Sequence, residues 1–328
     1  MRHHIVQEKY LRQWCKNAKD CQLWIYTHSD EKLFQRGPSW KGFWREDFNI
    51  YDEKGEEDAY YLPEEVTSHV DNLGLTAIKN INFGKQLEGL NRCYLSFYAA
   101  LQYIRTPKYR EDTDAMLDAQ VKHFWRLDTP SLEDVEMNRE DILKEEPKND
   151  KEREAIEKVR QMTDEEFKQT LFDAIHGDDV KVKLTNAGHS KQILKLERYA
   201  RDVFDFAWTI MLAPQGTSFI TSDAPCFAFA YKNSSLGAGL CSPNAVTFFP
   251  LTPSLCLMID PSIKGKREQF SKASKSNVRA VNQQILRHSH DCVVACEEAH
   301  LKHLLKGYQH IKGREVAVKS FGPYTLFS

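Results

Sequence analysis

Two histidines stand side by side near the start of the chain, at His3 and His4, ahead of a Tyr10-Leu11 pair. A neutral imidazole can act as a general base or as a ligand close to neutral pH. Neighbouring residues of a strand point to opposite faces, so we expect one of the two rings to enter a given pocket. The alternative is a structural histidine that pins the N-terminus into the fold.

A second candidate is Arg105, which opens the sequence Arg105-Thr106-Pro107. It follows a stripe of large apolar residues at helical spacing, which predicts a core-facing helix that ends before the proline. The members of that stripe are Leu90, Tyr94, Phe97, Leu101 and Ile104. An arginine in this place can satisfy the last carbonyls of the helix, or its guanidinium can bind a phosphate or carboxylate through two hydrogen bonds.

Ser222 and Asp223 form the third candidate, within the sequence Thr221-Ser-Asp-Ala-Pro225. They place a hydroxyl and a carboxylate where an apolar strand is expected to end. In an enzyme, Asp223 would orient a histidine or help to hold a metal, and Ser222 would be a nucleophile or a substrate-binding hydroxyl. Ser-Asp before Ala-Pro is also ordinary turn chemistry.

The elements that must position these residues fall into three regions of one domain, residues 1–328. We expect an N-terminal hairpin region at 1–62, a helical region at 63–213 with a polar insertion at about 132–168, and a C-terminal sheet region at 214–328. A capping box at Thr163 should begin one helix, and Gly177 should end it. The apolar stripe Leu196, Tyr199, Val203, Phe206 and Ile210 predicts a long core helix that stops at Pro214.

Helices that precede a sheet indicate an α+β fold. We therefore expect a helical central region packed on a C-terminal mixed or antiparallel sheet that also takes in the N-terminus. The eight cysteines are far apart and mostly in apolar surroundings, which is typical of unpaired core residues in a reducing compartment.

Charge is nearly balanced overall, with 45 Lys+Arg against 47 Asp+Glu, but it is unevenly distributed. Residues 263–328 hold 12 basic and five acidic residues, whereas residues 133–168 hold 14 acidic and eight basic ones. The basic stretch would favour a nucleic acid or another phosphate-bearing ligand, or would simply balance the acidic insertion. The longest apolar run, 206–213, is far below the roughly 20 residues of a membrane span, and no secretory signal is visible, so we expect a cytoplasmic protein.

Familiar catalytic motifs do not occur in the sequence. GxGxxG, the P-loop, HExxH, GxSxG and zinc-ribbon spacing are all missing, so nothing predicts a nucleotide cofactor. A divalent metal is left open, although clustered carboxylates are lacking and a metal-free acid/base mechanism is favoured.

Taken together, four fragments resemble one bacterial family, domain of unknown function 4238. They are His3-His-Ile-Val6 with Tyr10-Leu11, Arg105-Thr-Pro107, Thr221-Ser-Asp-Ala-Pro225 and Phe249-Pro-Leu-Thr-Pro253, with Val281-Asn282 as a later match. The chain departs from the family pattern at Gln7, where a proline is usual, and at Ala224, where an asparagine is frequent. The resemblance implies the architecture and the candidate residues but no reaction.

Two functions follow from these residues. In the first, the protein hydrolyses a phosphodiester or nucleic-acid substrate: His3 or His4 is the general base, Asp223 orients it, and Arg105 stabilises developing negative charge. In the second, the protein is a non-catalytic binding module whose polar cluster ties the N-terminus to the sheet. Convergence of His4, Arg105 and Asp223 on a cleft favours the enzyme, whereas a fully buried and mutually bonded cluster favours the module.

Overall fold

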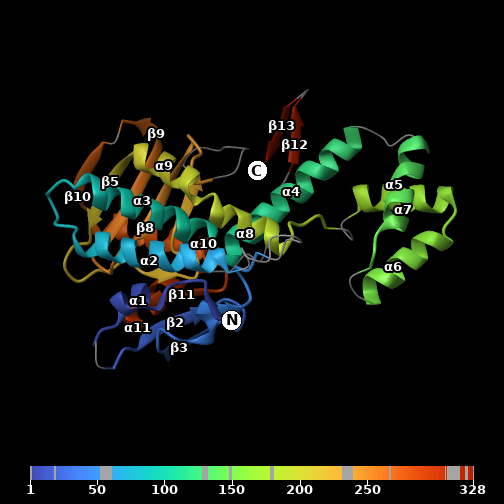
Figure 1. The fold of residues 1–328 in the computed structure, drawn as a ribbon. Helices are drawn as coiled ribbons and strands as arrows, with labels where there is room; N and C mark the ends of the chain where they lie inside the picture. The colour runs from blue at the N-terminus through green and yellow to red at the C-terminus, as the bar shows by residue number, and fades with distance from the viewer. Residues whose placement is uncertain are drawn as a thin grey trace. The chain divides into compact units, whose positions relative to one another are not determined.

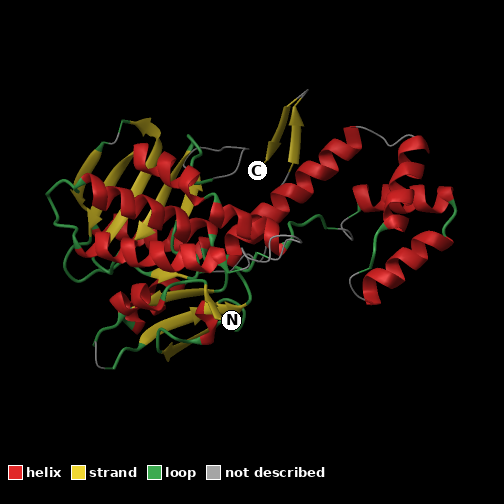
Figure 2. Cartoon of the chain, viewed as in Figure 1, coloured by secondary structure: helices red, strands yellow, loops and turns green. Residues whose placement is uncertain are grey.

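The structure is a computed structural model of residues 1–328. It describes residues 2–17, 20–51, 61–127, 132–147, 150–177, 181–230, 239–265, 267–306, 308, 318–321 and 324–327. Lys266 and residues 309–317 of the basic C-terminal stretch lie outside this part. Helices and sheets are both extensive, which confirms the α+β class (Figures 1 and 2).

The larger sheet has five strands in the order β10-β5-β9-β8-β7. Strand β10 runs parallel to β5 and the other neighbours are antiparallel, so the sheet is mixed. The strands are β5 (Phe206–Leu212), β7 (Phe227–Ala230), β8 (Ala245–Pro250), β9 (Leu255–Lys264) and β10 (Glu268–Lys272).

Both faces of this sheet carry apolar cores. Ile210 and Leu257 pack in one buried cluster with side chains of α3 and α9, whereas Met211 and Cys256 pack in another with side chains of α10. Successive residues of a strand point to opposite faces, so one sheet can serve both clusters. The helices are α2 (Leu62–Lys79), α3 (Gly89–Ile104), α8 (Asn186–Leu194), α9 (Leu196–Asp205) and α10 (Lys275–His288).

The N-terminal region joins a second sheet with the order β3-β2-β11-β6. Its central pair brings β2 (Leu23–Thr27) against β11 (Cys292–Ala295), so residues about 270 positions apart are hydrogen-bonded neighbours. The expectation that the sheets take in the N-terminus is thus confirmed. The other elements here are β1 (Arg2–His4), α1 (Glu8–Leu11), η1 (Arg12–Trp14), β3 (Lys32–Arg36), η2 (Lys41–Phe43), β4 (Trp44–Glu46), β6 (Thr221–Ser222) and α11 (Glu298–Leu305).

The predicted long helix through Ile210 is wrong. Helix α9 ends at Asp205, and the backbone turns extended at Phe206 (ψ 164°) to begin β5. The apolar residues from Leu196 to Ile210 are spaced by three and four positions, as in a helix. As a strand, however, β5 forms backbone hydrogen bonds with β9 on one side and with β10 on the other. That non-local pairing outweighs the local pattern.

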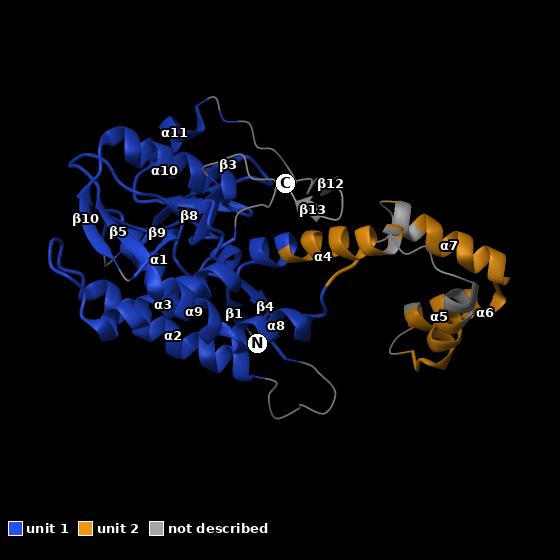
Figure 3. Cartoon of the chain, turned by 90° about the horizontal axis from the view of Figure 1, so that it is seen from above, with its two compact units in different colours: residues 1–112, 184–328 blue, residues 113–183 orange. Residues whose placement is uncertain are grey.

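Contacts divide the chain into two compact units, residues 1–112 with 184–328 and residues 113–183 (Figure 3). The second unit therefore extends beyond the polar stretch expected at 132–168. It contains most of α4 (Pro107–Leu127), with α5 (Leu132–Lys144), α6 (Asp150–Gln161) and α7 (Asp164–His176). Helix α7 begins with the predicted capping box at Thr163 and has Gly177 as its C-cap residue.

The cysteines do not all behave as unpaired core residues. Cys15 and Cys21 form a disulfide with their Cα atoms 4.9 Å apart, contrary to the sequence expectation. Cys15 is the C-cap residue of η1, and its spacing of six residues from Cys21 matches no standard disulfide or metal motif, so the bond could not be predicted from the sequence. The other six cysteines are free, and Cys226, Cys256 and Cys292 are buried as expected.

The C-terminal strands β12 (Val318–Phe321) and β13 (Tyr324–Phe327) pair as an antiparallel hairpin. Among the helices that the structure describes, none combines the length and the apolar character needed to cross a membrane.

Candidate functional site

A buried polar cluster lies where α2, α3 and β1 meet. We call it the Arg105 cluster, and its members are His4, Glu64, Asp71 and Arg105. Helix α2 contributes Glu64 and Asp71, which are seven residues apart and so share one helical face. Arg105 is the C-cap residue of helix α3.

Close packing of α2 against α3 sets the distance between these side chains. Gly74 of α2 lies so near to Tyr98 of α3 that a Cβ atom on Gly74 would be 2.1 Å from Tyr98 Cγ. Gly74 is one turn beyond Asp71, and Tyr98 is two turns before Arg105 on α3. A glycine at this contact therefore allows the carboxylate and the guanidinium to meet.

Arg105 and Asp71 form the central ion pair. Arg105 Nη1 donates to Asp71 Oδ2 at 2.9 Å, and the two side chains are 1% and 8% exposed. The other guanidinium nitrogens, Nε and Nη2, are buried and have no hydrogen-bond partner in the described part of the chain. These two nitrogens form the side edge of the guanidinium, which matches two oxygens of a phosphate or carboxylate.

A further unpartnered atom belongs to the same ion pair. Within the residues that the structure describes, Asp71 Oδ1 is buried without a hydrogen-bond partner, as are both polar atoms of Gln102, three residues before Arg105 on α3. Leaving a buried polar atom unpaired costs about 1–3 kcal/mol. Three unpaired atoms on one buried ion pair indicate a place where water or a ligand completes the hydrogen bonds.

The two histidines of β1 have different surroundings, and only His4 interacts with the Arg105 cluster. His3 is fully buried, and its Nδ1 accepts a hydrogen bond from the Asn49 amide at 2.7 Å. His4 is half-buried and interacts with the charges of Arg105 and Asp71. Burial lowers the pKa of both rings, and the positive charge of Arg105 lowers that of His4 further. Both imidazoles are therefore neutral at pH 7.

The two acids of α2 are shifted in the opposite direction. Burial raises the pKa of Asp71 and of Glu64, while the charge of Arg105 opposes both shifts. Glu64 is half-buried, so its carboxyl group lies closer to solvent than that of Asp71. A neutral His4 beside carboxyl groups with raised pKa values forms a set suited to general acid and base chemistry.

Asp223 lies in a separate arrangement at the end of β6. Its carboxylate accepts backbone hydrogen bonds from His290 at 2.9 Å, Asp291 at 2.7 Å and Cys292 at 3.0 Å. Burial raises the pKa of Asp223, and His290 and the three amides oppose this. Asp223 is 3% exposed, and its hydrogen bonds connect the end of β6 to the turn that precedes β11.

Ser222 takes part in the same turn. It is fully buried, and its Oγ accepts a hydrogen bond from the Ala224 amide at 3.1 Å. Asn282 of the Val281-Asn282 fragment also makes structural bonds: it accepts from the Ile220 amide at 3.0 Å and donates to the Ser218 carbonyl at 2.9 Å. The described contacts of Ser222 and Asp223 thus tie strands together.

The structure brings His4 close to Arg105, whereas His3 bonds to Asn49 and interacts with Asp47 and Arg110. The contacts of Ser222 and Asp223 go elsewhere. Sequence reasoning missed Asp71 and the part played by Glu64. The seven-residue spacing of Glu64 and Asp71 on one helix was the available signal. The described residues include no group of three or more His, Cys, Asp or Glu side chains that could hold a metal ion.

Comparison with known families supports the resemblance seen in the sequence. The model of the family described as "Protein of unknown function (DUF4238)" matches residues 2–299, which is most of the chain. No curated protein and no solved structure matches it. The match covers every residue of the Arg105 cluster and the turn at Asp223.

Proposed function

We propose that this chain, which belongs to the DUF4238 family of unknown function, is a hydrolase that cleaves a phosphodiester bond at the Arg105 cluster. One observation carries the proposal: the buried guanidinium of Arg105 is fixed by Asp71 through Nη1, while its Nε and Nη2 have no partner among the described residues. A phosphate group would accept both of these hydrogen bonds through two of its oxygens.

Residues around this edge supply the chemistry. Neutral His4 takes a proton from a water molecule, and the water oxygen then forms a bond to phosphorus. Arg105 stabilises the negative charge that develops on the phosphoryl oxygens. The bond between phosphorus and the leaving oxygen breaks, and Glu64 donates its carboxyl proton to that oxygen. Burial raises the pKa of Glu64, which favours the protonated form that this step requires. Asp71 holds the guanidinium in place.

In this proposal, Asp71 takes the orienting role that the sequence suggested for Asp223. Ser222 and Asp223 become structural residues, because their hydrogen bonds go to backbone amides of neighbouring turns and Asp223 also faces the His290 ring. We also propose a cytoplasmic location, supported by the six cysteines that remain free.

A second function is favoured by one observation, the 1% exposure of the Arg105 side chain. A binding module would hold an anion at the same guanidinium edge without cleaving it. In that case His4 and Asp71 would order the N-terminal strand around the bound group.

The test uses bis(4-nitrophenyl) phosphate, single- and double-stranded DNA, and RNA as substrates, each with magnesium and with a chelator. We expect cleavage of at least one of them by the parent, and a loss of roughly 10²–10⁴-fold in kcat for His4→Ala. The matched control is His69→Ala, which removes an exposed histidine of α2 and should leave kcat unchanged. Arg105→Lys keeps the charge but loses the two-nitrogen edge, so its KM should rise.

The outcomes separate the two functions. Equal activity of His4→Ala and the parent would contradict the hydrolase. If the parent cleaves none of the substrates but binds inorganic phosphate in calorimetry, and Arg105→Lys does not, the binding module is correct. If the parent neither cleaves nor binds phosphate, both proposals fail.

A further inference from the structure

Three cysteines gather at one end of the β2–β11 strand pair. Strand β11 is antiparallel to β2, so the end of β11 lies beside the start of β2. Cys296 directly follows β11, and Cys21 lies two residues before β2. Cys21 is bonded to Cys15, whereas Cys296 is a free thiol. A disulfide and a thiol are therefore neighbours in the fold.

Two further contacts bring Cys15 to the same place. Lys16 Nζ lies 3.1 Å from Glu297 Oε1, so the residue after Cys15 touches the residue after Cys296. The side chains of Cys15 and Cys296 also pack against one hydrophobic cluster. All three cysteines are half-buried, so none of the three sulfur atoms is sealed in the core.

The charges around Cys296 decide how readily its thiol ionises. Burial raises the pKa of Cys296 to about 11, and the charge of Glu297 acts in the same direction, whereas the charge of Lys16 opposes both. The thiolate is the form that attacks a disulfide. Its fraction grows about tenfold with each pH unit below this pKa, so Cys296 reacts at moderately alkaline pH.

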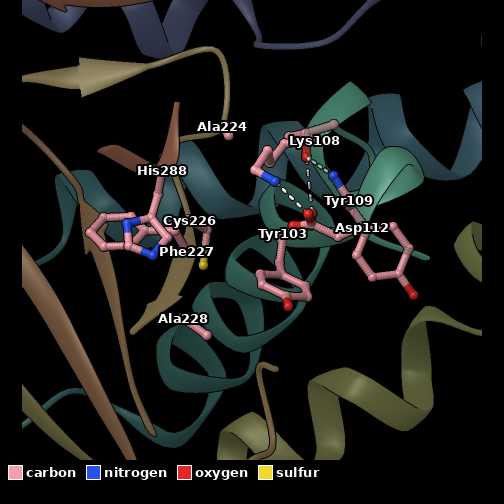
Figure 4. Close-up of a pocket in the computed structure, with 10 residues that line it drawn as sticks. Tyr103, Lys108, Tyr109, Asp112, Ala224, Cys226, Phe227, Ala228 and His288 are labelled. Carbon is pink, nitrogen blue, oxygen red and sulfur yellow. Dashed lines mark hydrogen bonds and ion pairs between the residues drawn. The ribbon is translucent and has the colours of Figure 1, made fainter. Parts of the chain in front are cut away.

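The fully buried cysteines have a different environment. Cys226 lines a small cleft beside Phe227 and His288 and is 3% exposed (Figure 4). Burial raises the pKa of Cys226, Cys256 and Cys292 far above the ordinary value of a thiol. These three side chains act as small apolar core residues, which leaves Cys296 as the thiol next to the disulfide.

We propose that Cys15, Cys21 and Cys296 form a thiol–disulfide exchange site. The Cys296 thiolate attacks Cys15 Sγ, a bond forms between these two sulfur atoms, and the Cys15–Cys21 bond breaks. Its electron pair leaves on Cys21 Sγ, which takes up the proton that Cys296 released. One disulfide and one thiol are present before and after, so the step needs no oxidant or reductant.

The product links η1 to the end of β11 and frees the Cys21 thiol. This proposal is independent of phosphodiester hydrolysis, because no residue of the Arg105 cluster takes part in it.

The test maps the disulfides of the full chain. The protein is kept at pH 7, 8 or 9, labelled with excess N-ethylmaleimide at pH 6 and digested with trypsin without a reductant. Trypsin cleaves after Lys16 and Lys19, so mass spectrometry separates the peptides of Cys15 and Cys21. We expect a peptide pair linked through Cys15 and Cys296, with labelled Cys21, that forms about tenfold faster with each pH unit. Diluting the protein tenfold should not change this rate, because the reaction occurs within one chain.

The variants identify the attacking thiol. Cys296→Ser should keep the Cys15–Cys21 bond and form no new linkage, whereas the matched control Cys241→Ser removes an exposed free cysteine and should exchange as the parent does. If Cys296→Ser fails to fold, Lys16→Gln replaces it. The Lys16 side chain is 76% exposed, and loss of its charge should slow the exchange severalfold.

Three results would overturn the proposal. The first is a parent that keeps only the Cys15–Cys21 bond at pH 9, and the second is a rate that falls on dilution. The third is exchange in folded Cys296→Ser, or in Lys16→Gln where it replaces that variant, at the rate of the parent.

Discussion

The hydroxyl of Tyr10 lies 2.8 Å from Thr221 Oγ1 and donates a hydrogen bond to the Pro250 carbonyl at 2.6 Å. The phenol has a single proton, so the Thr221 hydroxyl must donate to the Tyr10 oxygen. These contacts join the N-terminal helix α1, the strand β6 and the end of β8. Three of the family fragments thus meet at one buried hydroxyl.

Removing that hydroxyl should destabilise the protein. We expect Tyr10→Phe to lower the free energy of unfolding by about 1–3 kcal/mol, because the Pro250 carbonyl and Thr221 lose a buried partner. Urea unfolding of Tyr10→Phe, Thr221→Val and the double variant measures this. The double variant should lose less than the sum of the single losses. Strict additivity would show that the two hydroxyls do not interact.

Removing one charge of the buried Arg105–Asp71 pair should destabilise the protein more than removing both charges. Arg105→Met leaves the Asp71 carboxylate buried without its cation, which should cost about 3–5 kcal/mol. The double variant Arg105→Met with Asp71→Leu removes both charges and should recover much of this stability. Chemical denaturation of the three proteins gives the comparison. A loss below about 1 kcal/mol in Arg105→Met would contradict a buried ion pair.

Asp223 should be a structural residue. Asp223→Ala leaves one buried and two part-buried backbone amides without an acceptor, so we expect a loss of about 2–3 kcal/mol in unfolding free energy. Asp223→Asn retains one acceptor oxygen and should lose less. Phosphodiesterase activity of folded Asp223→Asn should equal that of the parent. If Asp223→Asn is stable but inactive, Asp223 takes part in the reaction and the structural interpretation is wrong.

His290 makes stability dependent on pH with a definite sign. Its Nε2 lies 2.8 Å from Glu111 Oε1 and its Nδ1 lies 3.9 Å from Asp223 Oδ2, and the hydrogen bond to Glu111 raises its pKa above 6.5. The folded state then binds the proton more tightly than the unfolded state. The stabilisation is complete below pH 6.5 and is lost as the pH rises through the raised pKa.

The measurement compares the parent with His290→Gln by urea unfolding from pH 5.5 to 9. The stability advantage of the parent should shrink across the range above 6.5. An advantage that grows with pH would mean that burial, which lowers the pKa, outweighs Glu111 and Asp223.

Gly74 should not tolerate a methyl group. In Gly74→Ala the new Cβ would approach Tyr98 Cγ to 2.1 Å, so α2 and α3 must separate. We expect a loss of about 1–3 kcal/mol, even though alanine favours the helix. Gly89→Ala is the control, since no atom lies within 4 Å of a Cβ placed there. Thermal unfolding of both variants is sufficient, and a stable Gly74→Ala would contradict the close contact.

Some of the fold follows from short stretches of sequence. Spacing of three and four residues marked α3, and the Thr163 capping box and Gly177 marked α7, because hydrogen bonds of a helix join residues four apart. The same spacing rule gave a wrong prediction at β5, because Phe206 and Ile210 fit an apolar helical stripe although they lie in a strand. Partners of a strand lie anywhere along the chain, so local spacing cannot identify them.

For the candidate site as well, the sequence indicated some residues and only the tertiary structure identified their partners. The sequence by itself indicated His3, His4, Arg105 and the class of fold, because residue type and motif order are local properties. Only the tertiary structure decided that Arg105 meets Asp71, while Asp223 meets the turn at residues 290–292. Burial and the choice of hydrogen-bond partner arise when α2, α3 and β1 pack together, and no single segment contains that information.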